Sequence, residues 1–237
     1  MSTKEEKLDK LVEGLKTAFG EELESVILYG SAASNEYHSD HSDLNVLVVV
    51  KNSRYHKLGR ADQIARWWNK TSNPPPLFFT EEEIRSSADV FPIEFSDMQD
   101  AHRILFGRDV LADLRIDPTH LRWEVEHELR GKLLSLRSRY VLVAGDVREA
   151  TTLLAQSLSS FAVLFRHALR LCGKSAALIK AEIFKAAGQE FHFDPAAFLE
   201  VLTVRRGEKK LRREDLDTLF EKYFDAVHKV IERIDAL

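Results

Sequence analysis

Two neighbouring stretches of the chain read Leu28-Tyr29-Gly30-Ser31-Ala32-Ala33 and Ser42-Asp43-Leu44-Asn45-Val46-Leu47-Val48-Val49-Val50. Each contains a short apolar run that predicts a buried strand. Gly30 ends the first strand, and a glycine lets a ligand approach the backbone closely. Ser31 then adds a hydroxyl beside the amides of a beginning helical turn, which suits a phosphate. Because side chains two apart on a strand share a face, Asp43 and Asn45 can contact the same metal ion.

The remainder of the first half alternates between helical and extended patterns. Apolar residues at helical spacing predict an amphipathic helix over residues 5–19 and a second helix over residues 58–69. Short apolar runs predict a third strand over residues 77–79 and a fourth over residues 90–95. Residues 97–106 are expected to form a helix. This mixture is typical of a mixed sheet with flanking helices.

After about residue 118 the pattern changes, and only helical periodicity remains. We therefore expect two domains. Residues 1–112 would form an α/β domain, and residues 113–237 would form an all-α helical bundle.

Composition narrows the range of functions. The chain has 237 residues, a net charge of −4 and a single cysteine, so neither an intramolecular disulfide nor a cysteine-based zinc site is possible. Basic residues concentrate in residues 205–213, and the acidic remainder argues against a general nucleic-acid binder. The N-terminus shows no signal peptide, and the apolar runs are too short to cross a membrane. We expect a soluble, cytoplasmic protein.

The Gly30-Ser31 turn and the Asp43-Leu44-Asn45 strand start resemble the nucleotidyltransferase superfamily, which includes aminoglycoside adenylyltransferases and DNA polymerase beta. Its members carry Gly-Ser after an apolar strand, Asp-x-Asp or Asp-x-Glu on the next strand, and a third carboxylate on a later strand. The best match for that third carboxylate is Glu94, with Asp97 as the second choice. The resemblance covers roughly residues 25–107.

The resemblance implies an enzyme that moves a nucleoside monophosphate from a nucleoside triphosphate, such as ATP, to an acceptor hydroxyl and releases pyrophosphate. Gly30 and Ser31 would bind the triphosphate. Asp43, Asn45 and Glu94 would hold magnesium or manganese, and Asp43 and Glu94 would be the catalytic carboxylates. The acceptor would be a small molecule or a protein rather than a polynucleotide. A homodimer is possible.

One residue departs from the family pattern. Asn45 stands where the family has a second carboxylate, and an amide oxygen binds a hard cation without supplying charge. This favours an alternative: a catalytically impaired protein of the same fold that acts as a nucleotide-binding regulator or as a toxin–antitoxin-type partner. His38, Asp40 and His41 precede the strand and could compensate, although a polar loop is the simpler explanation of these residues.

Two further residues have competing interpretations. In a strand over residues 90–95, Glu94 would be a buried carboxylate that needs a metal or a cation, or a strand-edge side chain facing water. Arg130, in the first helix of the bundle, could bind a nucleotide phosphate if the helical domain closes over the nucleotide. An exposed, ion-paired helix face accounts for Arg130 without any ligand.

Overall fold

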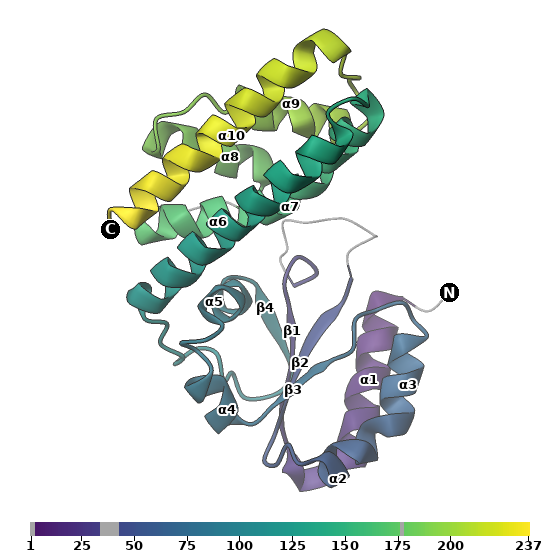
Figure 1. Cartoon of the computed structure of the whole chain (residues 1–237). Helices are drawn as coiled ribbons and strands as arrows, with labels where there is room; N and C mark the ends of the chain where they lie inside the picture. Colours follow the sequence, from purple (N-terminus) through teal and green to yellow (C-terminus); the bar gives the residue numbers. More distant parts are fainter. Residues whose placement is uncertain (1–2, 34–42, 176–177) are drawn as a thin grey trace. The chain divides into compact units, whose positions relative to one another are not determined.

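The computed structural model describes residues 3–33, 43–175 and 178–237, and it divides into two compact units, Met1–Asp117 and Pro118–Leu237 (Figure 1). The elements of the first unit are α1 (Lys4–Phe19), η1 (Gly20–Glu22), β1 (Leu23–Tyr29), β2 (Asn45–Val50), α2 (Tyr55–Leu58), η2 (Gly59–Ala61), α3 (Asp62–Asn69), β3 (Leu77–Phe79), α4 (Glu81–Ser86), α5 (Pro92–Asp100) and β4 (His102–Gly107). Each unit is described by itself below.

The first unit is built on a mixed sheet, as the sequence predicted. The described strands form four-stranded order β3-β2-β1-β4, in which β1 pairs antiparallel with both β2 and β4, and β2 pairs parallel with β3. Helices α1 and α3 lie on one face of the sheet, and α4 and α5 lie on the other (Figure 1). Both central strands are therefore covered on two sides, which explains their nearly continuous apolar sequences.

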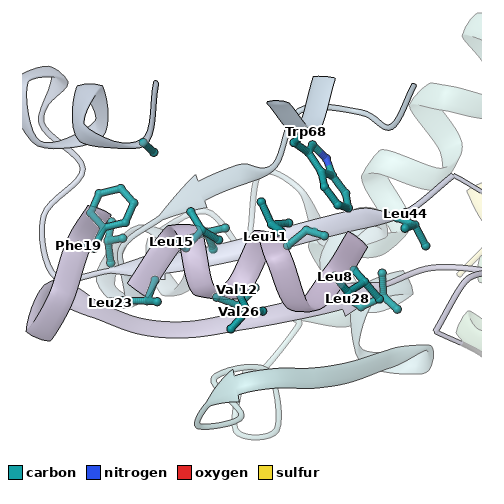
Figure 2. Packing of buried hydrophobic residues seen from close by; sticks show 14 residues of the cluster. Leu8, Leu11, Val12, Leu15, Phe19, Leu23, Val26, Leu28, Leu44 and Trp68 are labelled. Atoms are coloured by element: carbon teal, nitrogen blue, oxygen red, sulfur yellow. The ribbon is translucent and has the colours of Figure 1, made fainter. Parts of the chain in front are cut away.

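The face of the sheet that carries α1 has the larger core. Helix α1 starts with a capping box, in which Thr3 accepts from the Glu6 amide and Glu6 accepts from the Thr3 amide. Figure 2 shows its apolar stripe against the strands, together with Trp68 of α3. The helical part of this cluster consists of Leu8, Leu11, Val12, Leu15 and Phe19, and the strands contribute Leu23, Val26, Leu28, Val46, Val48 and Val50, with Leu44 just before β2.

The opposite face of the sheet carries the intervening side chains of the same strands, because successive residues of a strand point to opposite faces. Ile27, Leu47 and Val49 point away from α1 and join Ile84 of α4 and Phe95 of α5 in a second cluster. This alternation fixes which side chains of β2 face α5. Asn45, the first residue of the strand, has the same parity as Leu47 and Val49.

Two predicted elements near residue 100 are wrong in type. Residues 90–95 do not form a strand, because Pro92 begins helix α5. Proline suits the first helical position, since the N–H group that it lacks would have no partner within the helix there and its fixed φ is helical. Residues 97–106 do not form one helix, because α5 ends at Asp100 and the chain continues as strand β4. Short apolar runs cannot be assigned by periodicity alone, and here pairing with β1 decided the outcome.

The described part of the second unit is helical throughout, as expected. It contains α6 (Pro118–Val143), α7 (Val147–Leu171), α8 (Lys180–Glu190), α9 (Ala196–Arg205) and α10 (Arg213–Asp235). Aromatic rings fill its centre: Phe198 stacks on both Phe184 and Tyr223, with ring centroids 4.6 and 4.1 Å apart. None of the helices in the described ranges is both long enough and apolar enough to cross a membrane.

Candidate functional site

The candidate site lies where β1 ends and β2 begins. Because these strands run antiparallel, the end of one meets the start of the other, and Tyr29 is paired directly with Asn45. Gly30 and Ser31 follow Tyr29, and Asp43 comes two residues before Asn45. The two predicted motifs, which residues 32–42 separate in the sequence, are thus brought to one end of the sheet.

Gly30 shapes the turn after β1. Its φ of +79° is in the left-handed region that favours glycine, and its amide donates to the carbonyl oxygen of Ala101 at 2.8 Å. A Cβ at this position would lie 3.4 Å from Nδ2 of Asn45. The carbonyl of Gly30 accepts from the amide of Ala33 at 2.9 Å, which closes a tight turn with Ser31 exposed on it.

The start of β2 is held by contacts on the other face. Leu44 is buried in the α1 cluster, and its amide donates to Oδ1 of Asn73 at 3.1 Å. This anchoring fixes the register of the residues on either side. Asp43 is exposed just before the strand, and Asn45 is half-buried at its first position.

Glu94 reaches the same region from helix α5, which corrects its predicted place in a strand. It is exposed, so it is not a carboxylate buried in an apolar strand. Helix α5 is held against the sheet by Phe95 and Met98, and Glu94 and Asp97 border a cavity of about 470 Å³ that Gly30 and Asn45 also line. Four residues named from the sequence therefore meet around one pocket.

The rest of the pocket wall was not predicted from the sequence. It is apolar and consists of Tyr29, Leu77, Phe79, Phe91, Phe95 and Met98. Burial raises the pKa of the Tyr29 hydroxyl above its ordinary value. Strand β3, which lies beside β2, contributes Leu77 and Phe79 and no carboxylate to this wall. The predicted strand over Leu77-Phe78-Phe79 could have indicated part of this wall, since residues 77 and 79 of a strand share a face.

The predicted phosphate ligand Arg130 belongs to the second unit. Its Nε donates to Glu126 at 2.8 Å, and its Nη2 lies 3.2 Å from Asp235, with the side chain about half exposed (52%). This arrangement matches the ion-paired helix face that the sequence also allowed. His38, Asp40 and His41 lie outside the described residues.

The donor chemistry suits a hard divalent cation. Asp43 offers a carboxylate and Asn45 an amide oxygen at the same strand start, and Glu94 and Asp97 add carboxylates to the pocket that Asn45 lines. Magnesium and manganese prefer such oxygen ligands. Within residues 3–33, 43–175 and 178–237, no three His, Cys, Asp or Glu side chains are already grouped closely enough to hold a metal.

Comparison with known proteins agrees with this geometry. Residues 8–100 match the family described as the nucleotidyltransferase domain. No curated protein matches the sequence. Among solved structures, the spectinomycin adenyltransferase AAD(9) from Enterococcus faecialis, crystallised with ATP and spectinomycin, is similar at a TM-score of 0.56. The two chains are 12% identical, and the match covers 98% of this chain and 100% of that one, so the likeness extends over both units and concerns the fold.

The family match contains every predicted site residue except Arg130, and its Gly30-Ser31 and Asp43-Leu44-Asn45 segments lie at one end of the sheet. Residues 8–100, which lie within the first unit, therefore match a nucleotidyltransferase domain.

Proposed function

We propose that this protein transfers a nucleoside monophosphate from a nucleoside triphosphate to the hydroxyl group of a small acceptor, with magnesium or manganese bound at the end of the sheet. The observation that carries the proposal is the convergence of Gly30, Asn45 and Glu94 on one pocket in a nucleotidyltransferase domain. ATP is the first nucleotide to consider, because AAD(9) was crystallised with it. The comparisons give no support to the regulatory alternative.

The turn after β1 is assigned to the triphosphate. The amide of Gly30 already donates to Ala101, so this residue would act by shaping the turn and leaving room rather than by contacting a phosphate. The hydroxyl of the exposed Ser31 is the group that would bind phosphate oxygens.

The start of β2 is assigned to the metal. Asp43 and Asn45 would hold it, and Glu94 would complete the site from α5. When bound, the cation would neutralise charge that develops on the phosphate oxygens. Asp43 brings a full negative charge and Asn45 brings none, so Asp43 is the stronger ligand of the pair.

Glu94 is assigned a second role, as the proton acceptor. In the proposed reaction the acceptor oxygen forms a bond to the α-phosphorus, and the bond from that phosphorus to the bridging oxygen breaks. Pyrophosphate leaves with the electron pair, and the hydroxyl proton passes to a carboxylate. Glu94 is exposed to the pocket that the acceptor would enter, and Asp97 is the neighbouring second choice.

Arg130 remains a proposed phosphate ligand. To bind a phosphate it would exchange its contacts with Glu126 and Asp235, both of which are carboxylates. Its contribution is therefore secondary to that of the first unit.

The test is a calorimetric titration of ATP, GTP, CTP and UTP into the protein with magnesium, with manganese and with EDTA. We expect binding of at least one triphosphate that requires the metal, and we expect Asp43→Ala to abolish it. Asp89→Ala, which removes an exposed carboxylate of the same unit outside the pocket, is the matched control and should bind normally. Binding that is equal in EDTA, or unchanged in Asp43→Ala, would reject this assignment.

A further inference from the structure

The apolar wall of the pocket has no part in phosphate binding, metal binding or proton transfer. Leu77 of β3 and Phe91, the residue just before α5, face the same cavity and remain 40% and 44% exposed. Covering large apolar side chains lowers the free energy by about 25 cal/mol per Å² of apolar area removed from water. Two elements thus present uncovered apolar surface to one cavity, next to the proposed reaction centre.

The cavity has the dimensions and composition of a small-molecule site. Its volume of about 470 Å³ is in the range that holds a compound of a few fused or linked rings. Its walls are mostly apolar and aromatic, with a small number of polar groups at one side, Asn45, Glu94 and Asp97. Such a wall favours a ring with little hydrogen-bonding capacity, because hydroxyl groups placed against it would lose their water partners.

Together with the proposed positions of the triphosphate and the metal, the order of the strands argues that this wall lies on the acceptor side. Gly30 follows β1, Asn45 begins β2, and Leu77 begins β3, with β2 between the other two strands. In phosphoryl transfer the attacking and leaving oxygens lie roughly in line on opposite sides of the phosphorus. With pyrophosphate at the Gly30-Ser31 turn and the metal near Asn45, the attacking oxygen approaches from the side of Leu77 and α5.

The charged residues of the pocket restrict the charge that the acceptor can carry. None of the described residues that line it is Lys, Arg or His, whereas Glu94 and Asp97 are acidic. A carboxylate or phosphate on the acceptor would be repelled by these two groups. A neutral or cationic acceptor would not be.

We infer that the acceptor is a small compound with an apolar, flat ring, a hydroxyl group and no negative charge, and that Leu77 and Phe91 determine this specificity. The inference rests on the proposed function and adds the chemical class of its second substrate. In this complex the ring packs between Leu77 and Phe91, and the hydroxyl lies beside Glu94.

Four probes separate these properties in binding titrations with the full chain and no nucleotide. Benzyl alcohol carries a ring and a hydroxyl, tyramine adds a positive charge, mandelate adds a negative charge, and myo-inositol carries only hydroxyls. We expect the first two to bind with dissociation constants below about 5 mM, and the last two at least about tenfold more weakly.

Two variants locate the binding. Phe91→Ala and Leu77→Gln should weaken benzyl alcohol and tyramine at least about fivefold, since each removes apolar contact with the ring. Val90→Ala is the matched control, because Val90 is 59% exposed beside Phe91 and does not line the pocket. Thermal melting of each variant establishes that it is folded.

Three results would overturn the inference. The first is that neither ring probe binds the wild type, and the second is that both variants bind the ring probes as tightly as the wild type does. The third is that magnesium–ATP displaces benzyl alcohol and that Phe91→Ala weakens ATP and benzyl alcohol equally, which would assign the wall to the nucleobase. Failure of the proposed function would be seen in a different experiment, as the absence of metal-dependent triphosphate binding.

Discussion

Asn45 combines a backbone position fixed by the sheet with a side chain aimed at the pocket. Its backbone pairs with Tyr29, and its amide nitrogen is the atom nearest to where a Cβ of Gly30 would lie, at 3.4 Å. Of the two polar atoms of the Asn45 amide, only the oxygen can bind a cation. Asn45 would thus bind the metal without adding a negative charge to the site.

We predict that Asn45→Asp lowers the magnesium concentration needed for half-maximal triphosphate binding about tenfold, because a carboxylate adds a negative charge to the site. The titrations described above measure this directly. Asn69→Asp adds the same charge on the exposed end of α3 and serves as the control. An unchanged magnesium requirement in Asn45→Asp would mean that residue 45 is not a metal ligand.

Glu94 and Asp97 can be distinguished by paired amide variants. We predict that Glu94→Gln lowers kcat by about 10²- to 10⁴-fold, the usual contribution of a general base, and also raises the magnesium requirement, because Glu94 completes the proposed metal site. Asp97→Asn should retain most of the activity, since Glu94 would still be present to accept the proton. Steady-state kinetics with an acceptor identified from the probe classes would show this. The opposite ranking would move the proton acceptor to Asp97.

At the scale of elements, the junction of α5 and β4 positions the pocket. Helix α5 brings Glu94 over the sheet, and the chain then returns along β1 as the edge strand β4. Tyr29 of β1 pairs with Asn45 on one side and with His102 on the other. The amide of Gly30 closes the same junction on the carbonyl of Ala101. Displacing β4 would therefore disturb the turn after β1.

Gly107 ends β4 next to the backbone of Glu24 and Ser25 in β1. Its φ is +78°, and a Cβ there would collide with the carbonyl oxygen of Glu24. We predict that Gly107→Ala lowers the free energy of unfolding by about 2–4 kcal/mol, through both backbone strain and this collision.

Gly20→Ala is the control for Gly107→Ala in the same unit. Gly20 also has a positive φ, +54°, but nothing lies within 4 Å of its added Cβ, so we expect a smaller loss, about 1–2 kcal/mol. Urea denaturation measures both values. Equal losses in the two variants would show that backbone conformation alone, and not the contact with β1, accounts for the effect.

At the scale of the whole molecule, the chain has two units with separate cores. The first is a sheet covered on both faces, and the second is a helical unit centred on aromatic rings. Tyr223 lies fully buried in the second core, where its hydroxyl is 2.8 Å from Oγ of Ser157. Burial raises the pKa of this hydroxyl strongly.

This burial makes stability depend on alkaline pH. An unfolded tyrosine ionises near pH 10, whereas folded Tyr223 keeps its proton. The unfolded state thus binds fewer protons above that pH, and stability falls as the pH rises, by up to about 1.4 kcal/mol per pH unit. Below about pH 10 the contribution of Tyr223 to stability is fully present.

We predict that Tyr223→Phe makes the decline in stability between about pH 9 and pH 11 less steep, while costing about 1 kcal/mol at neutral pH for the lost hydrogen bond. Some decline should remain, because the pKa values of Tyr29 and Tyr140 are also raised. Urea denaturation across this pH range is the measurement. Tyr55→Phe is the control, since Tyr55 is 95% exposed. The prediction fails if both variants decline as steeply as the wild type.

The sequence by itself determined the mixed sheet, the helical second half and the motif residues Gly30, Ser31, Asp43 and Asn45. These features are local: a helical or alternating period shows which face is buried, and a glycine marks a turn within a few residues. The capping box at Thr80 and Glu83, which starts α4, is a local pattern of the same kind.

Only the tertiary structure decided how Glu94 reaches the pocket and what surrounds it. Residues 90–106 contain short apolar runs that fit either a helix or a strand. Their outcome depended on pairing between β4 and β1, which are far apart in the sequence. The apolar wall likewise needs Leu77 from β3 and Phe91 from the start of α5 to meet across the sheet end. Such contacts carry no local period, so the chain must be folded before they appear.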